Sequence, residues 1–323
     1  MDRLLTIACG DYDRTHALVD GSVKPEGLTL NWLDLPHLEI WTRMLNYYDF
    51  DASEISLSSF AISKTMGKPL LAIPVFPGRA FRHSYIFVNS NSGIREPQDL
   101  MGKNVGLGEF QQTATVWVRG ILQHEYGVAL ERIHWFTWTQ HSRMEMDLPK
   151  QYQVQKIPAG VKPDELLIKG ELDAVILTSL FPSFAQGAPN VRRLFENYQE
   201  VEAAYFKKTS IFPIMHTVAM REDLWKEHPW IATSLYKAFQ KSKQVAYERL
   251  NDLSPYKLSL VWVREPMARQ RELLGEDPWC DGIEKNRHTL ETLIGYLDEQ
   301  ELIKRKPRVE ELFAPNTLTL TWS

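Results

Sequence analysis

The chain has 323 residues, of which 44% are hydrophobic and 24% are charged, a composition typical of a globular protein rather than a disordered or collagen-like one. Its 41 acidic and 37 basic side chains give a formal net charge of -4, so it lacks the basic excess that usually marks a nucleic-acid-binding protein. The length exceeds what one hydrophobic core usually organises, and we therefore expect two lobes.

The sequence gives few signs of an extracellular or membrane location. Its two cysteines, Cys9 and Cys280, lie far apart and form no CxxC or Cys/His motif, which argues against a thiolate zinc site and an oxidising compartment. The first apolar run, residues 4–9, is too short for a signal peptide. The longest uncharged stretch, residues 174–191, contains two prolines and a glycine, which disfavour a membrane span. We expect a cytoplasmic protein without a membrane partner.

Strand-like apolar runs alternate with helical patterns over the first two thirds of the chain. The runs that predict strands are residues 4–9, 28–33, 52–56, 70–76, 85–88, 104–107, 133–137, 174–177 and 213–220. Helical spacing is found at residues 38–47, 59–66, 113–126 and 163–170. The last third instead predicts two long helices, 229–249 and 283–300, and a closing strand, 318–322. Such alternation is typical of an α/β fold with mostly parallel sheets.

The lobes are expected to be joined by short crossing segments, because no Gly- or Ser-rich linker is present. The crossings are predicted near residues 84–89 and 209–217. A chain that leaves one lobe, builds a second and returns gives a discontinuous first lobe, residues 1–88 plus 216–323, and an inserted second lobe, residues 89–215. A ligand cleft between the lobes is then expected.

Charged residues follow directly after the first predicted strand, in the segment CGDYDR (residues 9–14). Loops at the carboxyl ends of parallel strands commonly carry ligand groups in α/β proteins. Arg14 can hold a carboxylate through two hydrogen bonds, with Asp11 or Asp13 orienting it. The structural alternative is a turn with an aspartate that caps the next helix.

A first anion pocket is predicted where the third predicted strand runs into a helix. Ser58 and Ser59 lie at this helix start, where hydroxyls can cap the helix and leave backbone N–H groups facing an anion. Capping accounts for one serine, whereas three hydroxyls within residues 56–59 are more than a cap requires. The pattern therefore favours an anion site modestly.

A second anion group is predicted at residues 106–113, GLGEFQQT, again between a strand and a helix. The segment begins like a dinucleotide-binding fingerprint, but Gln111 stands where the third glycine is required. Gln112 and Thr113, at the helix start, can instead present amide and hydroxyl donors to an anion. Gln111 is expected to contact the substrate beside them.

Basic and imidazole side chains gather at the predicted crossings. Arg79, Arg82 and His83 precede an apolar strand, so partners are expected for Arg82 and His83. Arg79 and Arg82 are both expected among the substrate-binding residues. A structural and a functional interpretation of His83 are about equally supported. His216 lies in the second crossing, where it would face the same cleft, and the two interpretations are again balanced.

No HExxH, GxSxG or P-loop motif occurs, which counts against metalloprotease, hydrolase and kinase functions. The chain also lacks a carboxylate–histidine spacing typical of a metal site. Nine histidines are scattered along it, which leaves open a metal site assembled in space.

Several longer segments together resemble the 4,5-dihydroxyphthalate decarboxylase family. They are CGDYDR, SEISLSSF, IPVFPGRAFRHSYIFVN, the stretch from GEF to HEYGV, and DPW with GIEKNR near the C-terminus. The resemblance covers nearly the whole chain and implies a two-lobed, type II periplasmic-binding-protein-like fold. The family's usual Pro-Tyr-Gly after DPW reads Cys280-Asp281-Gly282 here, and the cysteine-rich motif of the related pyrimidine synthases is absent.

The resemblance implies conversion of 4,5-dihydroxyphthalate to protocatechuate and carbon dioxide. A dianionic substrate needs two carboxylate sites, for which Arg14 or Arg82 and the two helix starts are the candidates. His83 is the first choice as proton donor to the ring carbon and His216 the second, while Glu109 or Asp13 would accept from a ring hydroxyl.

No organic cofactor is required by this chemistry, because the phenol itself takes up the electrons. The expected partner is a small aromatic carboxylate, and an assembly of identical subunits stays open. The alternative function is that of a solute-binding protein that captures an aromatic or small carboxylate for an ABC transporter, since fold alone does not separate the two.

Overall fold

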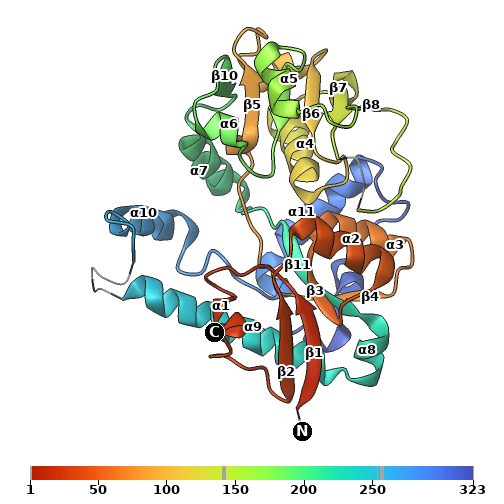
Figure 1. Ribbon diagram of the computed structural model, residues 1–323, viewed down its shortest axis with the longest axis vertical. Helices are drawn as coiled ribbons and strands as arrows, with labels where there is room; N and C mark the ends of the chain where they lie inside the picture. Colours follow the sequence, from red (N-terminus) through yellow and green to blue (C-terminus); the bar gives the residue numbers. More distant parts are fainter. Residues whose placement is uncertain (1, 140–142, 253, 255–257, 323) are drawn as a thin grey trace. The chain divides into compact units, whose positions relative to one another are not determined.

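The computed structural model describes residues 2–139, 143–252, 254 and 258–322 (Figure 1). Its contacts divide the chain into two compact units. Unit 1 consists of Met1–Arg79, Ile214–Glu291 and Pro307–Ser323, and unit 2 consists of Ala80–Pro213 and Thr292–Lys306. The lobe limits expected from the sequence, 1–88 with 216–323 and 89–215, stay a prediction, as does a ligand cleft between the lobes.

Unit 1 is built on a five-stranded sheet in which one strand runs against its neighbours. In spatial order the strands are β2 (Leu28–Leu33), β1 (Arg3–Ala8), β3 (Ala52–Ser56), β11 (His216–Arg221) and β4 (Leu70–Ile73). The β1 strand pairs in parallel with β2 and β3, and β11 pairs antiparallel with β3 and β4. Every residue of β3 and β4 is buried, as expected for strands covered on both faces.

Helices flank this sheet in unit 1, and all of them except α10 contribute buried residues. They are α1 (His16–Val19), α2 (His37–Tyr47), α3 (Leu57–Thr65), α8 (Glu222–Glu227), α9 (Trp230–Asn251), α10 (Arg264–Leu274) and the first part of α11 (Ile283–Glu299). The long helix α9 packs against α1 (Figure 1) and places Ile231 and Leu235 in one apolar cluster with Leu5 and Ile7 of β1. Burial of this stripe accounts for the helical spacing in the sequence.

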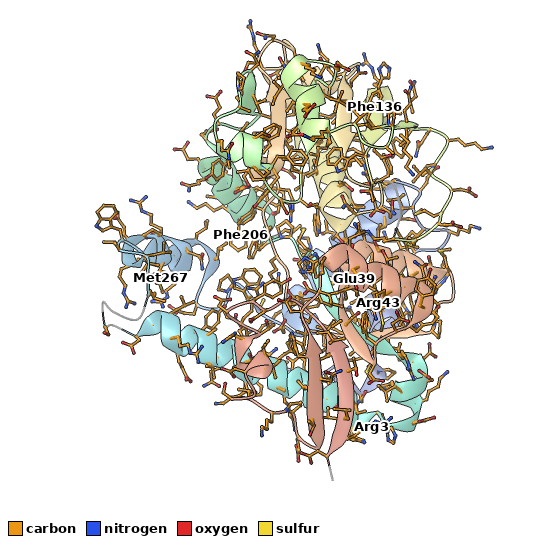
Figure 2. All side chains as sticks on the ribbon, viewed as in Figure 1. Arg3, Glu39, Arg43, Phe136, Phe206 and Met267 are labelled. Atoms are coloured by element: carbon orange, nitrogen blue, oxygen red, sulfur yellow. The ribbon has the colours of Figure 1, made fainter. Side chains whose placement is uncertain are left out.

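Helix α10 differs from its neighbours because it contributes no buried residue. Figure 2 shows its side chains, Met267 among them, projecting around the helix. On α2, by contrast, one side faces the core, while Glu39 and Arg43 form an exposed ion pair at 3.1 Å one turn apart (Figure 2).

Unit 2 is built on a six-stranded sheet. In spatial order its strands are β10 (Val191–Arg193), β5 (Ile86–Asn89), β9 (Ala174–Ile176), β6 (Asn104–Leu107), β7 (His134–Thr137) and β8 (Gln153–Lys156). The strands β9, β6, β7 and β8 are parallel, and β5 is antiparallel to both of its neighbours. The predicted class, α/β with mostly parallel sheets, is confirmed.

The helices of unit 2 are α4 (Thr113–Tyr126), α5 (Pro163–Lys169), α6 (Pro182–Ala185), α7 (Tyr198–Thr209) and the last part of α11. Helix α4 carries Gly120 where it meets α11, because a Cβ there would overlap the ring of Tyr296. Its buried face reaches from Thr113 to Leu122. Within the described ranges, no helix combines the length and the apolarity that crossing a bilayer requires.

The sequence misplaces one element and misses several short ones. The closing strand predicted at 318–322 is wrong: Pro315–Thr317 form a 3-10 turn, and the N–H of Leu320 donates back to the carbonyl of Thr317 at 3.2 Å. Backbone groups there form turn hydrogen bonds and are therefore not available to pair with a strand. The strands β8 and β10 were not predicted, because each is short and partly exposed with polar or basic residues.

Candidate active site

The carboxylate of Glu54 lies fully buried at the centre of a polar cluster in unit 1. The sheet explains the convergence. Strand β1 pairs with β3 so that Ala8 lies opposite Ser53, and the loop that follows β1 therefore reaches Glu54. The antiparallel strand β11 begins at His216, opposite Ser56. Loops at the ends of these strands consequently meet around one carboxylate.

Four donors surround this carboxylate. One oxygen of Glu54 accepts from Nδ1 of His216 at 2.5 Å, and the hydroxyl of Tyr12 donates to the carboxylate at 2.9 Å. The other oxygen accepts from the backbone N–H of Gly10 at 3.1 Å and from Sγ of Cys9 at 3.4 Å. Burial alone would raise the pKa of Glu54, but the two nearby imidazoles more than offset it and hold the pKa well below its usual range. Glu54 is therefore a stable anion.

A second imidazole, His37 at the start of α2, completes the cluster. Its Nε2 lies 2.6 Å from the hydroxyl of Tyr12 and 3.6 Å from the carboxylate of Glu54. Trp41, one helical turn further on, stacks on His37 with ring centroids 5.2 Å apart and meets His216 edge-on at 4.9 Å. The side chains of His37 and His216 are 39% and 18% exposed, so both imidazoles reach solvent while the carboxylate is closed off.

Tyr12 is held as a neutral phenol. Burial first, and the charge of Glu54 second, raise its pKa far above the ordinary value. Because its hydroxyl proton points to Glu54, the hydrogen bond with His37 assigns Nε2 of that ring as the donor. His37, Glu54 and His216 also bring one potential metal-ligand atom each within 4.8 Å of one another. The cluster can thus hold a proton or a cation.

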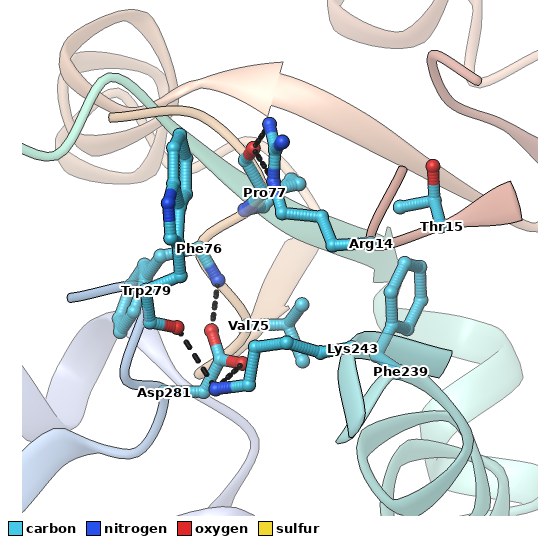
Figure 3. A pocket seen from close by; sticks show the side chains of 9 residues that line it. All are labelled: Arg14, Thr15, Val75, Phe76, Pro77, Phe239, Lys243, Trp279 and Asp281. Atoms are coloured by element: carbon cyan, nitrogen blue, oxygen red, sulfur yellow. Dashed lines mark hydrogen bonds and ion pairs between the residues drawn. The ribbon is translucent and has the colours of Figure 1, made fainter. Parts of the chain in front are cut away.

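Arg14, predicted to bind a carboxylate, is instead engaged by its own unit. Its Nε donates to the carbonyl of Pro77 at 2.8 Å, and a second guanidinium nitrogen contacts the same oxygen (Figure 3). Its Nη1 contacts Asp13 at 3.2 Å. The guanidinium lies 3.9 Å from the ring centroid of Trp279 and 4.4 Å from that of Tyr12. Arg14 therefore fixes the loop that carries Tyr12.

The cavity beside Arg14 has a volume of about 10 Å³, which is room for one water rather than for an aromatic acid (Figure 3). Lys243 and Asp281 close it, with their charged groups 3.4 Å apart, and Asp281 also accepts from the backbone N–H of Phe76 at 2.6 Å. Asp11, expected to orient Arg14, contacts His16 at 2.9 Å instead.

The anion pocket predicted at Ser58 and Ser59 is not open. Both serines are fully buried, and the hydroxyl of Ser59 donates to that of Ser56 at 3.2 Å. Helix α3 begins at Leu57, whose N–H donates to the carbonyl of Met215 at 3.0 Å. The helix start is therefore covered by the chain itself.

Arg79 also has a structural role in unit 1. The side chain is buried and donates to the carbonyl of Cys280 at 2.7 Å and to the side chain of Asn286. Burial lowers its pKa. Its guanidinium therefore anchors the segment before α11, and a role for Arg79 in binding substrate stays a prediction.

In unit 2, Glu109 is engaged by the chain itself, and its role as acceptor from a ring hydroxyl stays a prediction. It is buried in an ion pair with Arg143, whose backbone N–H also donates to it at 2.9 Å. Gln111 and Thr113 are buried, and the side-chain oxygen of Gln112 accepts from the N–H of Glu109 at 3.3 Å. The two glutamines and Thr113 stay predictions as substrate groups.

A cavity of about 460 Å³ opens in unit 2 at the carboxyl ends of β6 and β7, large enough for an aromatic acid. Its polar lining includes Glu109, Gln111, Thr139, Glu145 and Lys156. The position agrees with the rule that ligand groups gather at strand ends in α/β sheets.

His83, the first choice as proton donor, is enclosed by aromatic rings. Its side chain is 1% exposed and packs against Tyr126, Phe195 and Tyr205, with ring centroids 5.2–6.1 Å away. Burial lowers its pKa to about 4, so the ring is neutral near pH 7. Arg82 beside it is buried over the ring of Tyr85, and burial lowers its pKa to about 10. Both side chains are enclosed within unit 2, and their roles as proton donor and substrate-binding group stay predictions.

Glu54, His37 and Tyr12 are not among the site residues expected from the sequence. A signal for Glu54 was present, since an acidic residue inside a predicted strand needs partners wherever that strand is buried. His37 carried no comparable signal, because only the folded sheet brings residues 37, 54 and 216 together.

The two α/β units have the fold of the periplasmic binding proteins. The solved structure of the periplasmic aliphatic sulphonate binding protein SsuA of Escherichia coli superposes with a TM-score of 0.59 at 13% identity, covering 99% of this chain and 100% of that one. The predicted two-lobed fold is thereby confirmed. No family model matches the chain.

Curated relatives are more specific. A 4,5-dihydroxyphthalate decarboxylase of Comamonas testosteroni is 38% identical over 320 residues, which is 97% of each chain. A second one, of Pseudomonas putida, is 35% identical over 64% of this chain and 82% of its own. The chain belongs to the 4,5-dihydroxyphthalate decarboxylase family and is a carboxy-lyase. The resemblance read from the sequence is confirmed, and the alternative of a transporter's solute-binding protein is set aside.

Proposed function

We propose that the protein decarboxylates 4,5-dihydroxyphthalate, forming protocatechuate and carbon dioxide without an organic cofactor. The observation that carries this proposal is the 38% identity over nearly the whole length of a relative of that name. The Glu54 cluster adds support, because it provides an imidazole oriented by a buried carboxylate.

The reaction makes one C–H bond in place of one C–C bond. A proton adds to the ring carbon that bears the carboxylate, while the hydroxyl para to it gives up its proton and takes carbonyl character. The C–C bond then breaks, its electron pair returns to the ring, carbon dioxide leaves and the phenol regains its proton. The net change consumes one proton, so an acid beside the ring is the main requirement.

We assign this acid to His216, the second candidate from the sequence. Nδ1 of His216 points at Glu54, which leaves Nε2 as the atom that delivers the proton. Glu54 accepts from several donors and stays ionised, so it orients the ring and stabilises the imidazolium rather than taking up the proton itself.

Asp13 is the remaining candidate for contact with a ring hydroxyl. Its side chain is 62% exposed, and Arg14 contacts it from the loop that also carries Tyr12. The same loop is fixed by the bonds of Arg14 to Pro77, so a group presented on it is held in place before substrate arrives.

Purified protein mixed with 4,5-dihydroxyphthalate in D₂O tests the proposal. We expect protocatechuate and carbon dioxide in equal amounts, with one deuterium at the ring carbon that lost the carboxylate. His216→Asn is expected to lower kcat by about 10²–10⁴-fold. The matched variant His83→Phe is expected to retain turnover. Loss of turnover in His83→Phe with an active His216→Asn would move the donor to His83, and absence of protocatechuate would refute the function.

A further inference from the structure

We propose that His37, Glu54 and His216 form a binding site for one divalent transition-metal ion, such as Zn²⁺ or Co²⁺, and that the bound ion inhibits turnover. Binding follows from the cluster itself, whereas inhibition rests on the proposed function, in which His216 donates the proton. Metal and proton would be alternative occupants of one site.

The donor set fits this class of ion. Two imidazole nitrogens and one carboxylate oxygen are preferred by zinc and its neighbours in the first transition row, whereas magnesium and calcium prefer oxygen ligands alone. The three ligand atoms lie within 4.8 Å of one another, and the three residues come from α2, β3 and β11 of a single unit. The three ligand side chains are thus preorganised before an ion binds.

The distances require one small adjustment. Tetrahedral bonds of about 2.1 Å place neighbouring ligand atoms about 3.4 Å apart. Nε2 of His37 and the carboxylate of Glu54 are 3.6 Å apart, which meets that requirement. Nδ1 of His216 is 2.5 Å from Glu54, the distance of a shared proton, and it would lengthen by about 1 Å once an ion replaces the proton.

The surroundings hold the ligands in place. The N–H of Gly10 and Sγ of Cys9 both donate to one oxygen of Glu54, and the ring of Trp41 packs against both imidazoles. Such outer contacts fix ligand orientation in metal sites and are worth about 10–100-fold in affinity. His37 is 39% exposed, so an ion can enter from its side and keep a water as the fourth ligand.

Occupation excludes the proton-donor arrangement for a simple reason. Nδ1 of His216 cannot donate a proton to Glu54 and bind an ion at once. The hydroxyl of Tyr12, 2.6 Å from Nε2 of His37, must also give up that hydrogen bond. Inhibition by the ion is therefore expected to be reversed by a chelator.

Cobalt titration of the EDTA-treated full chain tests the site without substrate. We expect the visible absorption of four-coordinate Co²⁺ to saturate at one ion per chain and to be displaced by Zn²⁺. The band should be lost in His37→Gln and in Glu54→Gln. The matched control is His124→Gln, because His124 also pairs with a carboxylate, that of Glu299 at 2.6 Å, but lies outside the cluster.

Three results overturn the proposal: no band in the wild-type chain, an unchanged band in His37→Gln, or loss of the band in His124→Gln. His37 is partly exposed, so the His37→Gln comparison stands even if Glu54→Gln fails to fold. Added Zn²⁺ should abolish turnover, and EDTA should restore it; full turnover with the site occupied refutes inhibition. If the protein decarboxylates the substrate but binds no metal, the metal site is refuted and the proposed function stands. If it binds metal but does not decarboxylate the substrate, the proposed function is refuted and the metal site stands.

Discussion

Because the imidazole of His83 is enclosed, the stability of unit 2 is expected to fall as the pH is lowered. In the folded chain burial lowers its pKa to about 4, against 6.5 for the exposed ring. Between these values the unfolded chain binds a proton that the folded chain does not. The neutral ring therefore contributes fully to the free energy of unfolding above pH 6.5, and this contribution is lost as the pH falls from 6.5 towards 4.

The size of the effect follows from the same two values. One pKa unit corresponds to about 1.36 kcal/mol, so the drop from 6.5 to about 4 costs about 3 kcal/mol once the pH reaches 4. At pH 5 about two thirds of that loss is expected, roughly 2 kcal/mol. Replacement of His83 by Phe, a ring of similar size that does not titrate, should remove this loss and leave the aromatic contacts in place.

Urea unfolding of the wild-type chain and His83→Phe, followed by circular dichroism at pH 7.5 and pH 5, measures the difference. We expect the variant to lose about 2 kcal/mol less than the wild type between the two pH values. His124→Phe, at an exposed imidazole, serves as the control and should behave like the wild type. Equal losses in the wild type and His83→Phe would refute the assignment of a neutral, structural His83.

Three further outcomes follow from the described contacts. Glu54→Gln keeps the size of the side chain but removes the charge, and steady-state kinetics should show kcat about 10²–10⁴-fold lower with a smaller change in KM; unchanged kcat would contradict the orienting role. Arg143→Met leaves the carboxylate of Glu109 buried without its cation, and urea unfolding should show a loss of about 3–5 kcal/mol that adding Glu109→Gln relieves. Gly120→Ala should cost about 1–3 kcal/mol in the same assay because its methyl group overlaps Tyr296, and a neutral result would contradict that packing.

The α/β class and most long elements could be read from the sequence, because apolar periodicity reports which face each segment buries. The run at β4 is fully apolar and is fully buried in the sheet. Strands such as β10, three residues with two arginines, carry no such pattern, since they are held by backbone bonds to a neighbour rather than by burial. Such strands can be predicted only once the position of the adjacent strand is known.

The site was predicted less well, for a different physical reason. A charged residue near a strand end was interpreted as open to ligand, yet Arg79 and Arg82 are buried with partners inside their own units. Exposure is a property of the packed chain, and sequence alone does not report it. His216 was expected to be the second choice as proton donor, which stays a prediction, and its contacts with Glu54 and His37 could not be expected because sheet register sets them.

The path of helix α11 limits how the protein can be divided. Residues 292–306 belong to unit 2, although the residues before and after them belong to unit 1. A fragment of unit 2 that ends at residue 213 would therefore lack Tyr296 and contain a cavity beside Gly120. The buried guanidinium of Arg119 would also lose its 2.9 Å hydrogen bond to Gln300. To isolate unit 2, residues 292–306 would have to be joined to the fragment that ends at residue 213. The fragment without them is expected to aggregate.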